Sequence, residues 1–229
     1  MLLLPVLALI PGHQRDRAQA IIHLCFRFYI AMLQRLGLLT IDIAGAERLT
    51  SSTGRLIVAN HPSVLDVVIL MALIPRVQCI VKHQLWNSFL LGGLMRRAGY
   101  IRNDLEPDVF VEACRVAVEQ GYSLIIFPEG TRTRPGALPH FKRGFANLAM
   151  AINAGIQLVM ITCDPPTLIK GEPWWRIPPR KPHFRVVVDE CLDMSTYPGY
   201  RSRSIGVRKF VAEVQAHYAK KLGEMAAAS

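Results

Sequence analysis

Short apolar runs alternate with longer helix-like segments along most of this chain, and that alternation limits the available folds more than any other feature. Four runs read as buried strands, at residues 56–59, 77–81, 123–127 and 156–162. Segments of about 10–15 residues with helical periodicity lie between them. Continuous apolar runs are typical of strands that are covered on both faces. We therefore expect an α/β fold: a single domain with a mostly parallel mixed sheet flanked by helices.

The remaining expected elements fit the same plan. Short strands are expected at 41–43, 100–101 and 184–188, and helices at 14–39, 63–74, 85–97, 107–120, 144–154 and 207–222. The proline-rich stretch 165–182 breaks the pattern and is expected to be a loop. Its Trp174 and Trp175 stand beside arginines, which suits either a lipid headgroup layer or a loop folded back onto the domain. The sequence leaves both possibilities open.

Composition points to an anionic partner and to a membrane surface. Lys and Arg total 27 against 17 for Asp and Glu, giving a formal charge of +10, and the mean hydropathy is +0.25. We find no basic stripe with interleaved aromatics, so nucleic acid is not an expected partner. Uninterrupted apolar runs also stay shorter than the ~18 residues of a membrane-spanning helix. The five cysteines lack metal-site or disulfide spacing, which favours a reducing compartment and no bound metal.

The N-terminal segment carries most of the membrane expectation. Residues 1–13 are apolar but broken by prolines and lack a basic start, so we do not expect a cleaved signal peptide. In residues 14–39 the polar side chains form one narrow helical stripe, and the remainder is apolar. The stripe consists of Asp16, Gln19, His23, Arg27 and Gln34. We expect 1–39 to be a membrane-interface segment with an amphipathic docking helix, and 40–229 to be the main domain. The alternative is a helix packed across the domain with its polar stripe in water.

A histidine and an aspartate follow the first buried strand. His61 comes directly after Asn60 at the strand's carboxyl end, where open α/β sheets place their ligands. Pro62 suits the start of a helix, and Asp66 lies about one and a half turns further on. The two side chains could therefore meet, leaving one imidazole nitrogen to act as a base. A helix cap beside a solvated carboxylate explains this motif alone equally well.

A second polar turn follows the apolar run 123–127. It reads Phe-Pro-Glu-Gly-Thr-Arg over 127–132. Gly130 allows a ligand to approach the backbone closely, and Arg132 can donate two hydrogen bonds to a phosphate or carboxylate. Glu129 could hold Arg132 in place or accept a bond from a substrate hydroxyl. The plain alternative is a polar turn with a solvated arginine, but its place at a second strand end argues against that.

Together the two turns resemble the lysophospholipid acyltransferase family. Its N-H-x4-D motif is matched by Asn60, His61 and Asp66, and its F-P-E-G-T-R motif by residues 127–132. Weaker similarities are Lys82-His83-Gln84-Leu85 to a K-x-x-L segment, Phe141–Phe145 to F-K-x-G-A-F, and Ile156–Thr162 to a V-P-I-type strand. The resemblance covers about residues 40–165.

The resemblance implies O-acyl transfer at the cytoplasmic face of a membrane, by a peripheral or monotopic protein. His61 would take the proton of an acceptor hydroxyl while Asp66 orients the ring. The donor would be acyl-CoA or acyl-carrier protein, used as a co-substrate with no tightly bound cofactor, and the acceptor a lysophospholipid. The acceptor would be bound by Asn60, Lys82, Arg102 and Arg132, with Arg132 and Lys82 on its phosphate and the Glu129-Gly130-Thr131 turn shaping the pocket.

One motif departs from the family pattern. The family's second motif commonly reads G-x-[IV]-x-[IVF]-D-R, whereas this chain has Gly99-Tyr100-Ile101-Arg102-Asn103-Asp104-Leu105. Leu105 stands at the usual arginine position, and Arg102 is displaced by three residues, which flips the face on a strand. An acceptor other than a glycerophosphate, or a non-catalytic lipid-binding protein on the same fold, therefore remain alternatives. A His-Asp metal-dependent phosphohydrolase is not favoured, because His61 is followed by Pro62.

Overall fold

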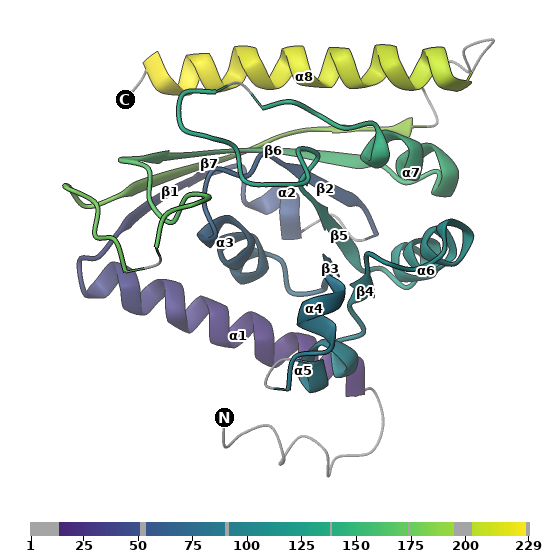
Figure 1. Cartoon of the computed structure of the whole chain (residues 1–229), viewed down its shortest axis with the longest axis horizontal. Coiled ribbons are helices and arrows are strands. Elements are labelled where there is room, and N and C mark those ends of the chain that lie inside the picture. The colour runs from purple at the N-terminus through teal and green to yellow at the C-terminus, as the bar shows by residue number, and fades with distance from the viewer. Residues whose placement is uncertain are drawn as a thin grey trace.

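A computed structural model describes residues 14–50, 54–89, 92–137, 139–173, 175–194 and 203–227. Its strands form one seven-stranded sheet in the order β1-β7-β6-β2-β5-β3-β4 (Figure 1). All neighbouring pairs are parallel except β6 and β7, which are antiparallel. The expected mostly parallel mixed sheet is therefore confirmed. The strands are β1 (Thr40–Ala44), β2 (Leu56–Ala59), β3 (Val77–Val81), β4 (Ile101–Arg102), β5 (Ser123–Ile126), β6 (Ile156–Asp164) and β7 (His183–Leu192).

Helices cover both faces of this sheet. They are α1 (Gln14–Arg35), α2 (Glu47–Thr50), α3 (Leu65–Leu73), α4 (His83–Trp86), α5 (Gly92–Arg97), α6 (Pro107–Glu119), α7 (Gly144–Ile152) and α8 (Arg203–Ala227). Side chains alternate between the two faces along β2: Ile57 and Ala59 pack in the cluster that contains α1 and α3, and Leu56 and Val58 in the cluster that contains α6, α7 and α8. Figure 1 shows α8 along one side of the sheet and α1 along the other, outside α3.

The connections after β2 and β5 diverge, although these two strands are neighbours. The chain leaves β2 through α3 on one face and reaches β3, whereas it leaves β5 through α7 on the other face and reaches β6. Diverging connections open a crevice outside the carboxyl ends of the two strands, which is where open α/β sheets bind their ligands. The polar turns that begin at Asn60 and Phe127 both lie at this position.

Two expectations about helices were wrong in detail. The single helix expected over 85–97 consists of two short helices, α4 and α5, separated by residues that include 87–89. The C-terminal helix is longer than the expected 207–222, since α8 begins at Arg203 and ends at Ala227. The apolar residues 1–13 and Trp174 lie outside the described residues.

The N-terminal helix α1 directs part of its polar stripe toward the domain and not into water. Gln19 is buried, with its amide donating to the carbonyl of Ala98 at 2.9 Å and its oxygen accepting from the N–H of Val77 at 3.1 Å. The Nδ1 of His23 lies 2.9 Å from the carbonyl oxygen of Met71. Gln19 and His23, two of the five stripe residues, thus face the domain together with the buried Ile22 and Ile30, while other large apolar side chains of α1 face outward. Those exposed above one third are Leu24, Phe28 and Tyr29, followed by Leu36 just beyond the helix.

Candidate active site

His61 and Asp66 are in direct contact. The Nδ1 of His61 lies 2.9 Å from Oδ2 of Asp66, which also accepts the backbone N–H of Ser63 at 2.7 Å. Asp66 reaches back toward His61 because it stands in the first turn of α3, where side chains lean toward the helix N-terminus. The side chain of Asp66 is fully buried, while that of His61 is 18% exposed. The expectation that these two side chains meet is confirmed.

Burial sets the electrostatics of the pair. Loss of solvent raises the pKa of Asp66 to about 6, although the hydrogen bonds from His61 and Ser63 act in the opposite direction. Its second oxygen, Oδ1, is buried and has no hydrogen-bond partner among the described residues. With Nδ1 bonded to the carboxylate, Nε2 of His61 is the nitrogen left to exchange a proton. The Phe127 ring stacks on the imidazole at 4.0 Å between centroids and further limits its rotation.

Glu129 holds the backbone around His61. Its Oε1 accepts the N–H of His61 at 3.0 Å and the hydroxyl of Thr133 at 2.8 Å, and the N–H of Thr133 donates to the carbonyl of His61 at 2.8 Å. Desolvation raises the pKa of Glu129, against the hydrogen bonds it accepts. No ion pair links Glu129 with Arg132 in the part of the chain that the structure describes. Glu129 therefore positions the loop that carries His61.

Asn60, like Glu129, holds the backbone next to His61 in place. Its Nδ2 donates to the carbonyl of Ile161 at 2.8 Å, and its Oδ1 accepts the N–H of Ile161 at 2.8 Å. The side chain is buried and continues the pairing of β2 with β6 by one residue. Both polar ends of this amide are thus engaged, which places Asn60 beneath the crevice as a support for His61.

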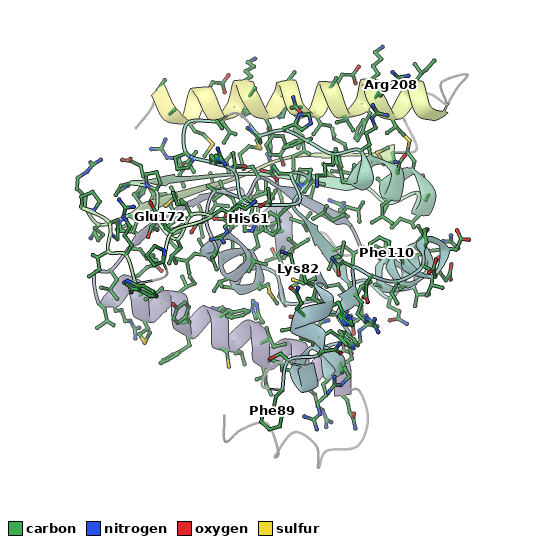
Figure 2. All side chains as sticks on the ribbon, viewed as in Figure 1. His61, Lys82, Phe89, Phe110, Glu172 and Arg208 are labelled. Carbon is green, nitrogen blue, oxygen red and sulfur yellow. The ribbon has the colours of Figure 1, made fainter. Side chains whose placement is uncertain are left out.

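The cations expected to bind phosphate lie at different distances from His61 along the sheet edge. Arg132 follows β5, next to β2, and its Nη1 donates to the carbonyl of Leu168 at 2.7 Å. Gly130 has φ +69°, a conformation that favours glycine, and it is exposed together with Thr131. Lys82 follows β3, two strands from β2, or roughly 10 Å at ordinary strand spacing, and it is exposed (Figure 2).

Arg102 forms an ion pair with Asp104. Its Nε and Nη2 donate to the two carboxylate oxygens of Asp104 at 2.9 and 2.6 Å. The hydrogen bond from Arg102 lowers the pKa of Asp104, and His83 lies 3.0 Å from the same carboxylate. Arg102 also ends β4, three strands from β2. Leu105 packs against the apolar cluster that contains α6. Neither side chain reproduces an arginine directed at the His61 crevice.

Sequence reasoning missed three contributors to the site: Ser63, Phe127 and Thr133. Ser63 and Phe127 lie inside the recognised motifs and Thr133 directly follows the second one, so position in the turn was the available signal, but the hydrogen-bond and stacking partners could not be read from the sequence. A cavity of about 370 Å³ adjoins the site, with Asn60, Pro62, Thr133 and Cys163 in its wall. Within the described ranges, no group of three or more His, Cys, Asp or Glu side chains could hold a metal ion.

Comparison with known proteins identifies a family and a fold. A family model described as Acyltransferase matches residues 40–164. A protein of Cocos nucifera named 1-acyl-sn-glycerol-3-phosphate acyltransferase is 36% identical over 129 residues, which cover 53% of this chain and 41% of that protein. Proteins of the same name from Limnanthes douglasii and Helicobacter pylori are 37% and 35% identical, over 53% and 47% of this chain and 45% and 48% of theirs.

The matches thus span less than half the length of these relatives. A crystal structure titled as the 1-acyl-sn-glycerophosphate (LPA) acyltransferase PlsC from Thermotoga maritima superposes with a TM-score of 0.67 at 18% identity, covering 96% of this chain and 88% of that one. This likeness confirms the fold. Because the family model covers more than half of the sequence, the chain belongs to the Acyltransferase family.

Proposed function

We propose that this protein is an O-acyltransferase that moves a fatty acyl group from an acyl thioester to the free hydroxyl of a lysophospholipid such as 1-acyl-glycerol-3-phosphate. The observation that carries the proposal is the contact between His61 and the buried Asp66 at the crevice between β2 and β5. The names of the similar proteins support the same reaction class.

In the proposed reaction, Nε2 of His61 takes the proton of the acceptor hydroxyl. The oxygen attacks the thioester carbonyl carbon, the carbon–sulfur bond breaks, and the leaving thiolate takes the proton back from His61. Asp66 fixes the tautomer and stabilises the imidazolium that forms between these steps. The acyl group passes directly between the substrates, so no residue of the chain needs to become acylated.

The acceptor phosphate would lie over the turn after β5. In 1-acyl-glycerol-3-phosphate the reacting hydroxyl and the phosphate are on adjacent carbons, so the phosphate must bind close to His61. Arg132 and the Glu129-Gly130-Thr131 turn are one strand away, at roughly 5 Å of strand spacing. Lys82 can reach the same space with its long side chain. The neutralised Arg102 favours a second candidate, an acceptor without a glycerophosphate group.

The acyl donor would be acyl-CoA or acyl-carrier protein, which share a phosphopantetheine thioester. The acceptor would come from a membrane that the exposed apolar side of α1 contacts, on the cytoplasmic face. The outward Trp175 and Ile177 of the 165–182 loop, 67% and 88% exposed, support the same contact. None of the helices in the described ranges is both long and apolar enough to cross a bilayer.

Thiol release tests the proposal. Purified protein is incubated with palmitoyl-CoA or palmitoyl-acyl-carrier protein and a panel of lysophospholipids, and the products are identified by mass spectrometry. We expect a diacyl product with wild type and a loss of at least ~10³-fold with His61→Ala while the fold is retained. Normal turnover by His61→Ala would sink the base assignment. Vesicle binding without thiol release across the panel would favour a lipid-binding protein.

A further inference from the structure

Lys142 lies over the turn that is proposed to hold the acceptor phosphate. A β-carbon placed on Gly130 would lie 3.0 Å from the Nζ of Lys142, and 3.4 and 3.6 Å from its Cε and Cδ. The outer half of the lysine side chain therefore runs along the bare backbone of Gly130. Gly130 directly follows Glu129, whose carboxylate binds the backbone N–H of His61. The ammonium thus lies on the loop that is fixed to the proposed base.

The base of this lysine is rigidly held. Its backbone N–H donates to the carbonyl of Pro128 at 2.9 Å, which closes the segment onto the same turn. The preceding residue, Phe141, is buried and packs edge-on against Tyr218 at 4.9 Å between ring centroids. The Tyr218 hydroxyl donates to the carbonyl of Val58, two residues before Asn60. The backbone segments that carry Lys142 and His61 are therefore connected through the packing of Phe141 on Tyr218.

The ammonium of Lys142 is available to bind an anionic ligand. Its side chain forms no ion pair with any carboxylate in the described segments, and it is exposed. Arg102, by contrast, is bound at two points to Asp104 and lies three strands from β2, roughly 14 Å at ordinary strand spacing. Because the Arg102 guanidinium is already paired, a second cation for the phosphate is expected nearer the β5 turn.

We propose that Lys142 is a phosphate-binding residue of the acceptor site and supplies a second cation beside Arg132. Its ammonium, which lies against the backbone of Gly130, and the Arg132 guanidinium, two residues further along the same turn, would both bind the phosphate monoester. This inference rests on the proposed acyl transfer to a phosphorylated acceptor. Lys142 would thereby favour phosphorylated acceptors over uncharged acceptors.

The test compares Lys142→Gln with Lys142→Arg and with Arg143→Gln, a matched control that removes the neighbouring exposed charge. For lysophosphatidate, we expect Lys142→Gln to raise KM by roughly tenfold or more at nearly unchanged kcat, because one charged hydrogen bond is lost from both ground and transition states. Lys142→Arg should restore most of the affinity, and Arg143→Gln should leave KM unchanged. The KM for the acyl donor should stay constant in all three variants.

Inorganic phosphate provides a second readout that does not depend on the acceptor. Its dissociation constant, measured by titration of each protein at low salt, should rise in Lys142→Gln and not in Arg143→Gln. An unchanged phosphate affinity in Lys142→Gln overturns the inference, as does an equal loss in Arg143→Gln. If wild type transfers no acyl group to any phosphorylated acceptor, the proposed function fails, while the phosphate titration still judges Lys142.

Discussion

At the scale of single residues, the buried carboxylate of Asp66 costs stability where the proposed reaction needs it. Burial raises its pKa from 3.8 to about 6 in the folded protein. The folded chain therefore binds this proton more tightly than the unfolded chain. The resulting stabilisation is complete below pH ~3.8 and is lost as the pH rises through about 6. In the proposed reaction a charged Asp66 holds His61 in one tautomer, and the rest of the fold must offset the loss of stability that its charge causes.

Asp66→Asn should remove this pH dependence. Relative to wild type, the variant should gain up to about 3 kcal/mol in free energy of unfolding between pH 4 and pH 7, measured by urea unfolding. Asp189→Asn is the control with the opposite sign. Partial burial acts to raise the pKa of Asp189, but hydrogen bonds from His217 and the Glu190 backbone and the charge of Lys221 lower it overall. A parallel change in both variants would contradict the burial argument.

At the scale of elements, α1 combines a polar contact with the domain and an apolar outer surface. A helix that only packed across the domain would bury its apolar side chains, but Leu24, Phe28 and Leu36 are 58%, 71% and 64% exposed. On its inner side, Gln19 and His23 bond to the domain beside the buried Ile22 and Ile30. We expect replacement of these three apolar side chains by serine to weaken sedimentation with anionic phospholipid vesicles about a hundredfold, since roughly 3 kcal/mol of apolar burial is lost.

The control for this experiment removes the same number of exposed apolar side chains from other elements. Ile43, Val109 and Ile205, on β1, α6 and α8, are 41%, 55% and 55% exposed. Their triple serine variant should sediment with vesicles as wild type does. Equal losses in both triple variants would show that general surface hydrophobicity, and not α1, governs binding.

At the scale of the whole molecule, the sequence was sufficient to predict the features that depend on residues close together along the chain. The apolar runs predicted the strands, and the spacing of His61 and Asp66 predicted their contact. Hydrogen bonds between residues far apart in the sequence could not be predicted. Asn60, for example, bonds to Ile161, 101 residues away. The orientation of α1 depends on the carbonyl of Ala98, which only folding brings near Gln19. Likewise, periodicity showed the polar stripe of that helix but could not show which side met the protein.

Tyr218 of α8 makes a buried long-range contact with the sheet. Its hydroxyl donates to the carbonyl of Val58 at 2.6 Å and accepts the N–H of Val159 at 3.1 Å, joining the last helix to two central strands. Tyr218→Phe leaves these buried backbone groups without that partner, so we expect a loss of roughly 1–3 kcal/mol in free energy of unfolding.

The half-exposed Tyr29 supplies the matched control, because Tyr29→Phe should change the free energy of unfolding by less than about 0.5 kcal/mol. Val58 lies two residues before Asn60, at the end of the strand that carries His61. Loosening it should therefore also lower kcat in proportion to the fraction of molecules with a displaced β2 end. A Tyr218→Phe protein as stable as Tyr29→Phe would mean that packing of the ring alone, and not the hydroxyl, holds α8 to the strand that precedes His61.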